Sequence, residues 1–154
     1  DVLKIRLIKM FATGLGLGYA PLAPGTAGSL LGIPLFYGMA SFPWMLYLLT
    51  ATAFACLAGY LSNEAEPLFP GKDSPRIVID EIAGMLVTFF LVTPTPVHIV
   101  LGFCLFRIFD IVKIFPANRF QRRLPGGLGI VADDLAAGVY ANLVLAGLIH
   151  GFGI

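Results

Sequence analysis

Charge is the feature that this sequence most conspicuously lacks. Only 12% of its 154 residues are Asp, Glu, Lys or Arg, although 58% are hydrophobic. The uncharged stretches are residues 10–63, 82–106 and 135–154. The charged side chains form three clusters, at Asp1–Lys9, Glu64–Glu81 and Arg107–Asp134. Each uncharged stretch is long enough to leave a charged surface, cross a bilayer and either return or end, so we expect every acid and base on or near one membrane face.

Other absences exclude whole classes of function. A net charge of only +1 leaves no basic footprint for nucleic acid. Cys56 and Cys104 lie inside apolar runs without the short spacing of a metal knuckle. No Gly-Lys-Ser/Thr follows the Gly-rich loop, which excludes a Walker motif, and the basic start precedes no cleavable apolar run, so no signal peptide is predicted. His98 and His150 fall far from the acids, which excludes a Ser-His-Asp triad.

The apolar segments predict an all-α, multi-pass membrane protein with one domain over residues 1–154. Residues 2–11 alternate apolar and basic side chains, which favours an amphipathic helix on the membrane surface. Residues 12–29 are predicted as a loop because Pro21 and Pro24 prevent a regular helix. About five apolar helices are predicted, over residues 30–41, 44–61, 77–93, 97–115 and 131–150. Whether the short 30–41 helix crosses the membrane stays open.

The basic residues predict the orientation. Nine of the ten lie in the N-terminal tail, in the 62–76 loop, or in the 116–130 loop with the adjacent Lys113. The turns near residues 42 and 95 hold none. The positive-inside rule therefore puts the N-terminus and both charged loops in the cytoplasm.

Carboxylates gather at the helix ends on this predicted cytoplasmic side. They are Glu64, Glu66, Asp80, Glu81, Asp110, Asp133 and Asp134. Carboxylates brought together repel one another unless a cation or bases intervene. Hard oxygen ligands near phosphate chemistry suggest Mg²⁺. The nearby bases could bind an anionic, oxygen-rich group; they are Arg107, Lys113, Arg119, Arg122 and Arg123.

The alternative is a belt of interfacial salt bridges, with acids at helix N-termini favoured by the macrodipole alone. That alternative is favoured for the loop charges Glu66, Asp73, Arg122 and Arg123. A functional role is favoured for Asp80, for Asp110, and for Asp133 or Asp134, because these acids sit within apolar helices.

Two Gly-rich segments precede helices. Ala23–Ser29 (APGTAGS) offers backbone N–H groups and two hydroxyls, although Gly and Pro also simply make loops. Gly126–Gly129 (GGLG) precedes the Asp133-Asp134 helix and lets the backbone approach a ligand closely.

The ordered set of motifs resembles the phosphatidylglycerophosphatase A family across residues 13–141. The segments that carry the resemblance are Gly14–Gly18 (GLGLG), Ala23–Ser29, Lys72-Asp73, Val78–Gly84 (VIDEIAG), Leu105–Asp110 (LFRIFD) with Lys113, Gly126–Ile130 (GGLGI) and Asp133–Gly138 (DDLAAG). One departure is Lys113-Ile114-Phe115-Pro116, where the family usually has Lys-Pro-Trp-Pro. This change leaves a less broken helix near Lys113.

The resemblance implies a Mg²⁺-dependent lipid phosphatase of the bacterial inner membrane. Its reaction is the hydrolysis of phosphatidylglycerophosphate to phosphatidylglycerol and phosphate in phospholipid biosynthesis. The substrate is an anionic phosphomonoester on a lipid, so its headgroup meets the enzyme at the cytoplasmic interface, where the charges of this sequence are expected.

We assign roles on this basis as a hypothesis. Asp80, Asp133 and Asp134 hold Mg²⁺, with Glu64 or Glu81 as a further ligand. Arg107 and Lys113 neutralise the phosphate. Asp110 either binds the metal or orients Arg107 and Lys113. The hydroxyls and backbone around Thr26, Gly28 and Ser29 donate hydrogen bonds to the substrate. Direct attack by water and a covalent aspartyl-phosphate both remain open.

Functions of other classes are weighed against this one. A small ion transporter would use intramembrane acids, but transporters bind at the bilayer midplane and often carry internal repeats, neither of which is visible here. A CDP-alcohol phosphotransferase would need an Asp-Gly-x-x-Ala-Arg signature, which is absent. A non-catalytic membrane scaffold has no need of acids entering three helices at one depth.

Overall fold

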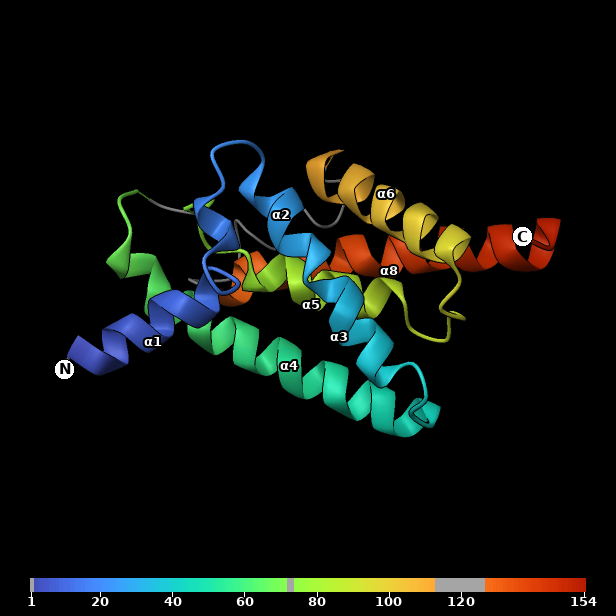
Figure 1. Ribbon diagram of the computed structural model, residues 1–154, viewed down its shortest axis with the longest axis horizontal. Coiled ribbons are helices and arrows are strands. Elements are labelled where there is room, and N and C mark those ends of the chain that lie inside the picture. Colours follow the sequence, from blue (N-terminus) through green and yellow to red (C-terminus); the bar gives the residue numbers. More distant parts are fainter. Residues whose placement is uncertain (1, 72–73, 113–126) are drawn as a thin grey trace.

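The computed structural model describes residues 2–71, 74–112 and 127–154. Within these ranges the chain is all-helical and contains no strand, which confirms the predicted class (Figure 1). The elements are α1 (Val2–Ala12), η1 (Leu17–Tyr19), α2 (Pro24–Leu30), α3 (Gly32–Met39), α4 (Trp44–Ala65), η2 (Glu66–Leu68), α5 (Ile79–Thr88), α6 (Pro96–Val112) and α8 (Gly127–Phe152).

Two of the described helices, α4 and α8, are long and apolar enough to cross a membrane. Only 33% and 22% of their most apolar windows are buried inside the protein. Large apolar side chains such as Leu49 and Leu143 are 67% and 62% exposed. A soluble protein rarely leaves so much apolar surface uncovered, so both helices favour association with a membrane. The prediction of about five apolar helices is not confirmed.

Helix α5 is the main departure from the predicted segments. A helix was expected over residues 77–93, but α5 has only 10 residues. Ten residues rise about 15 Å, half of a hydrocarbon core of about 30 Å. After Thr88 the chain turns through Leu91, whose φ of 59° lies in the left-handed region. Residues on nearly all sides of α5 are buried, so this apolar segment is a central core helix.

Other boundaries also differ from the prediction. Residues 12–29 are not all loop, because α2 already begins at Pro24. Proline is tolerated at the first helical position, where its missing N–H would have no helical partner. The 62–76 loop is shorter than expected because α4 continues to Ala65. Helix α8 begins at Gly127, four residues before the predicted start at residue 131. The remainder of the 116–130 loop lies outside the described residues.

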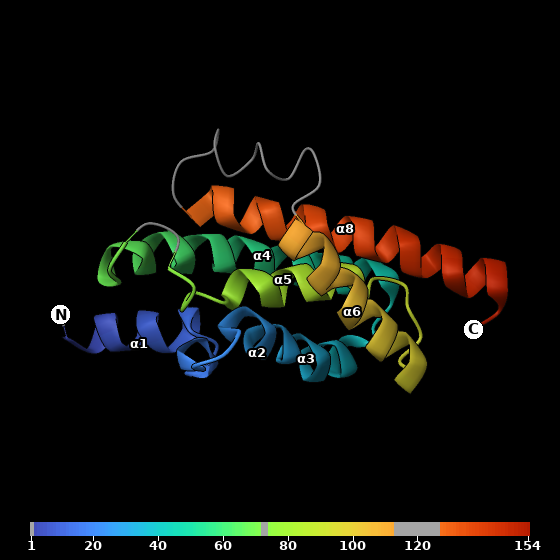
Figure 2. The same ribbon diagram turned by 90° about the horizontal axis from the view of Figure 1, so that it is seen from above.

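The helices are arranged around α5. It packs against α2, α3, α4, α6 and α8, and most extensively against α8. Viewed from above, α8 lies on one side of α5, and α2 and α3 lie on the other (Figure 2). The amino end of α5, which carries Asp80 and Glu81, therefore lies among several other helices.

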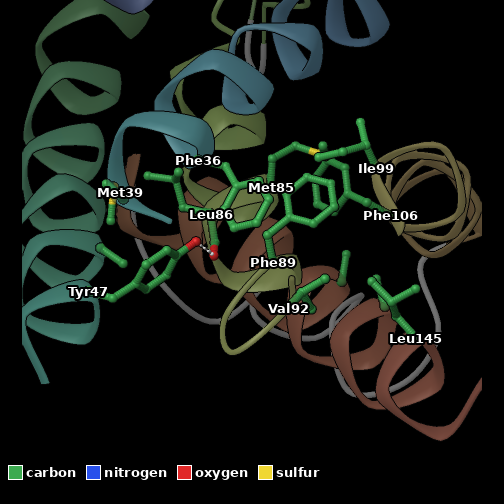
Figure 3. Close-up of a cluster of buried hydrophobic side chains, with 13 residues drawn as sticks. Phe36, Met39, Tyr47, Met85, Leu86, Phe89, Val92, Ile99, Phe106 and Leu145 are labelled. Atoms are coloured by element: carbon green, nitrogen blue, oxygen red, sulfur yellow. Dashed lines mark hydrogen bonds between the residues drawn. The ribbon is translucent and has the colours of Figure 1, made fainter. Parts of the chain in front are cut away.

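The carboxyl end of α5 carries the larger apolar core (Figure 3). The rings of Phe36 and Phe89 stack there with their centroids 4.6 Å apart. Tyr47 and Phe106 complete this aromatic centre, and both are almost fully buried. Helices α3 and α4 and the end of α5 are thus joined by aromatic packing, which stabilises more than area burial alone.

Candidate active site

Two glycines bring α5 and α8 into close contact. A Cβ atom on Gly138 would collide with the carbonyl oxygen of Gly84, and one on Gly84 would lie 2.8 Å from the carbonyl oxygen of Asp134. Small residues at such a crossing let two backbones approach closely. Asp80 lies four residues before Gly84, and Asp134 lies four residues before Gly138. One helical turn is 3.6 residues, so the same crossing brings these two carboxylates to the same end of the helix pair.

Asp80, Glu81 and Asp134 form one cluster. Each offers a carboxylate oxygen, and these oxygens all lie within 4.8 Å of one another. Asp80 and Asp134 are only 4% and 5% exposed. Asp80 and Glu81 are in the first turn of α5, where the helix macrodipole favours negative charge. That effect is worth about 1 kcal/mol at most sites, too little to balance three adjacent desolvated carboxylates.

One carboxylate oxygen of each residue in this cluster lacks a protein partner. Among the described residues, no hydrogen bond reaches Asp80 Oδ1, Glu81 Oε2 or Asp134 Oδ2, although all three atoms are buried. Buried polar atoms are nearly always hydrogen-bonded, and unpaired ones call for an unseen ligand or another explanation. A divalent cation fits this donor set, because hard cations take several carboxylate oxygens. The three residues are therefore the group that could hold a metal.

Arg107 on α6 is held from two sides. Its Nη1 donates to Asp110 Oδ2 at 2.6 Å and to Ser29 Oγ at 3.3 Å. The Arg107 and Asp110 side chains are only 16% and 13% exposed, so their ion pair is largely desolvated. Asp110 thus orients Arg107, which is one of its two predicted roles, and its carboxylate also lies beside Asp134 of the acidic cluster. Arg107 Nε is buried and has no partner among the described residues, so it keeps a free donor.

The first turns of α2 pack against this arginine and against the acidic cluster. The Ser29 hydroxyl donates to the Gly25 carbonyl at 2.8 Å and accepts from Arg107. It is fully buried, so it supports Arg107 through contacts inside the protein. A Cβ on Gly25 would collide with Glu81 Oε1 and would lie 3.4 Å from both Nη atoms of Arg107. The side chains of Glu81 and Arg107 therefore both pack against Gly25, in space that a larger residue would fill.

The other predicted site residues lie in different surroundings. Glu64 Oε2 pairs with Lys4 Nζ at 3.3 Å, and Glu64 is not part of the acidic cluster. Asp133 is buried on α8, but it is not in the cluster either, because adjacent helical residues point about 100° apart. A Cβ on Gly28 would collide with Val78, so this glycine serves packing. Thr26 is half-buried on α2. Lys113 lies outside the described residues.

Comparison with known families agrees with the motif order. The model of the phosphatidylglycerophosphatase A family matches residues 10–149. The chain belongs to this family. The matched range includes the segments that supply the acidic cluster and Arg107.

Three curated relatives were found at similar levels of identity. The phosphatidylglycerophosphatase A of Escherichia coli (strain K12) is 38% identical, with 99% of this chain and 90% of the relative covered. That of Haemophilus influenzae (strain Rd) is 36% identical, with 90% and 86% covered. A Bacteroides thetaiotaomicron relative named "Putative phosphatidylinositol-3-phosphatase" is 35% identical, with 89% and 90% covered. No solved structure matches the chain. The ion-transporter alternative has no support, because the family and these relatives are named as phosphatases.

Sequence reasoning missed the role of three glycines, which allow the close contacts between helices at this site. Gly84 and Gly138 belong to the motifs VIDEIAG and DDLAAG, four residues after Asp80 and Asp134 respectively. The repeated spacing of an acid and a glycine was the available signal. Gly25 was noted only as part of a loop, yet it is the residue on which Glu81 and Arg107 meet.

Proposed function

We propose that this chain is a Mg²⁺-dependent membrane phosphatase that hydrolyses phosphatidylglycerophosphate to phosphatidylglycerol and inorganic phosphate. The observation that carries the proposal is the convergence of Asp80, Glu81 and Asp134 beside a buried, oriented Arg107, in a chain of the phosphatidylglycerophosphatase A family. Carboxylates for a metal and a guanidinium for phosphate oxygens are the groups that phosphoryl chemistry needs.

Asp80, Glu81 and Asp134 would hold the Mg²⁺ ion. Their unpaired buried oxygens support this assignment. When bound, Mg²⁺ supplies Lewis-acid polarisation of a phosphoryl oxygen and lowers the pKa of water. Asp133 remains a predicted catalytic residue outside the cluster of three. Attack by water and attack by an aspartate both remain open for this site.

Arg107 would bind the phosphate of the substrate. Its free Nε–H is available to an oxygen, while Asp110 and Ser29 hold the guanidinium through its Nη1 atom. A fixed guanidinium loses little conformational freedom when it binds, and this favours the transition state. We retain Lys113 as a second predicted cation for the phosphate, and Thr26 and Gly28 as predicted neighbours of the substrate.

We place the enzyme in the bacterial inner membrane as a multi-pass protein with its site at the cytoplasmic face. The exposed apolar surfaces of α4 and α8 support membrane insertion. The basic residues flank the site and are absent from the opposite turns, which supports the cytoplasmic side. A site at this interface would meet a lipid headgroup without moving it through the hydrocarbon.

A phosphatidylinositol phosphate is the second candidate substrate, because of the name of the Bacteroides relative. Both substrates carry a phosphomonoester on the headgroup of a glycerophospholipid. A cation held by the carboxylates, together with Arg107, would bind that shared phosphate, so discrimination must come from contacts with the alcohol part of the headgroup.

The test is phosphate release by purified protein in detergent, from each of the two lipids, with Mg²⁺ or with EDTA. We expect Mg²⁺-dependent release from phosphatidylglycerophosphate, lost in Asp80→Asn and retained in the control Glu66→Gln. Faster release from phosphatidylinositol 3-phosphate would select the second candidate. Folded protein that releases phosphate from neither lipid would refute the phosphatase assignment.

A further inference from the structure

The carboxyl end of α5 lies inside the protein, and its last four carbonyls all accept hydrogen bonds. A helix leaves its last four carbonyls without helical partners, and a buried end must satisfy them in another way. In α5, the Phe89 N–H donates to Met85 O at 3.2 Å. The Phe90 N–H donates to Val87 O at 3.2 Å. These two bonds leave the carbonyls of Leu86 and Thr88 for other donors.

Side chains from two different helices supply those donors. Tyr47 Oη on α4 donates to Leu86 O at 2.7 Å (Figure 3). Asn142 Nδ2 on α8 donates to Thr88 O at 2.9 Å and to Phe90 O at 2.8 Å. The end of α5 is therefore anchored on two sides.

The anchor has a fixed relation to the acidic cluster. Thr88 lies eight residues after Asp80 on α5, and Asn142 lies eight residues after Asp134 on α8. Eight residues are about two turns, or about 12 Å, so both pairs meet on the same faces of two helices running in parallel. The Asn142–Thr88 hydrogen bond joins α8 to α5 at one end of this contact, and the Asp80–Asp134 pair lies at the other end. A rotation or slip of α5 at the anchor would therefore move Asp80 and Glu81 relative to Asp134.

We propose that Tyr47 and Asn142 are positioning residues of this site: together they fix the depth and rotation of α5, and thereby the alignment of its carboxylates with Asp134. The inference rests on the proposed function, because alignment matters only if the cluster binds a cation. An unsatisfied carbonyl in an apolar environment is costly, so the two side chains hold one arrangement of α5 against alternatives.

The surroundings of Asn142 allow a graded set of variants. Tyr47, Leu86 and Asn142 line a cavity of about 300 Å³ between α4, α5 and α8. Asn142→Leu keeps the number and branching of the side-chain heavy atoms and removes both N–H donors. Asn142→Gln keeps the amide, and the cavity has room for its additional methylene. Val144→Ala on the same helix is the control, because Val144 is 40% exposed and does not line this cavity.

The experiment measures Mn²⁺ binding by electron paramagnetic resonance, together with kcat and KM for phosphatidylglycerophosphate at saturating Mg²⁺. For Asn142→Leu we expect the Kd for Mn²⁺ to rise roughly tenfold, as when other supporting residues of metal sites are removed. We also expect kcat to fall while the lipid KM stays unchanged. Asn142→Gln should recover part of both losses, and Val144→Ala should match the wild type.

A purely structural role would lower thermal stability in EDTA without changing the Kd for Mn²⁺ or kcat, and this result would overturn the inference. If Asn142→Leu does not fold, Tyr47→Phe replaces it, because this variant removes only one oxygen atom. The Kd for Mn²⁺ and kcat are then measured in the same way. Wild-type protein that binds Mn²⁺ but hydrolyses no lipid would refute the proposed function, while the Mn²⁺ measurements would still test the anchor.

Discussion

The two ends of α5 differ in how their polar groups are satisfied. At the carboxyl end, all of the last four carbonyls accept hydrogen bonds, two of them from side chains of other helices. At the amino end, Asp80 and Glu81 each keep a buried oxygen without a partner. The same ten-residue helix thus has one end that is complete within the protein and one that is not.

This difference separates structure from function. Five buried side-chain atoms of the described residues have no hydrogen-bond partner, and four of them belong to Asp80, Glu81, Arg107 and Asp134. Random imperfection would scatter such atoms through the fold. Their concentration at one end, with both charge signs present, is what a site for a cation and an anionic group requires.

The largest effect is expected from removing one carboxylate of the cluster at the amino end of α5. For Asp134→Asn we expect activity to fall at least about a hundredfold, because metal assistance supplies several kcal/mol to the transition state. The adjacent Asp133→Asn should weaken Mn²⁺ binding much less, since Asp133 is not in the cluster. Isothermal titration with Mn²⁺ and phosphate release measure both effects. The reverse order of the two variants would contradict the proposed ligand set.

The next largest effect is expected when α5 and α8 are forced apart at the Gly84–Gly138 contact. Gly138→Ala places a methyl group against the Gly84 carbonyl and 3.1 Å from Val87 Cβ. We expect a loss of about 1–3 kcal/mol of stability, typical of overpacking, together with reduced Mg²⁺-dependent activity. Gly147→Ala, on the same helix with nothing within 4 Å, is the matched control and should be neutral or stabilising. Equal thermal unfolding of both variants would refute the close crossing.

Arg107→Lys tests whether the shape of the cation beside the acidic cluster matters in addition to its charge. A lysine keeps the charge but loses the planar guanidinium, whose Nη1 bonds both Asp110 and Ser29. We expect kcat to fall roughly tenfold, as for one or two charge-assisted hydrogen bonds of about 1.5–3 kcal/mol that are partly replaced. Steady-state kinetics measure this loss. Wild-type kcat in Arg107→Lys would show that only the charge matters.

The smallest expected effect is on stability at the complete end. Tyr47→Phe removes the hydroxyl that bonds Leu86 O. We expect a loss of about 1 kcal/mol in unfolding free energy, the usual scale for one hydrogen bond in water or in a bilayer. Tyr60→Phe, on an exposed face of the same helix, should change it by less. Thermal unfolding of the two variants in one detergent gives the comparison, and equal stabilities would show that the Tyr47 bond contributes nothing.

Sequence reasoning selected the acids that the structure brings together more successfully than it placed the helix boundaries. Asp80, Asp110 and Asp133 or Asp134 were selected because ionisable groups within apolar helices are costly and stand out. Arg107 was selected as one of several neighbouring bases that could bind an anionic group. The 77–93 segment was read as one span because apolar composition continues past Thr88. Periodicity does not reveal that a helix ends there, since the end depends on donors from Tyr47 and Asn142, which are distant in sequence.

By itself, the sequence determined the helical class, the separation of charged from apolar regions, and the motif order that identifies the family. These follow from composition and local spacing. Only the tertiary structure decided that Asp134 and Glu81 join Asp80, while Asp133 points elsewhere and Glu64 pairs with Lys4. The reason is geometric: helix phase and the Gly84–Gly138 contact set which carboxylates meet, and both depend on how distant helices pack.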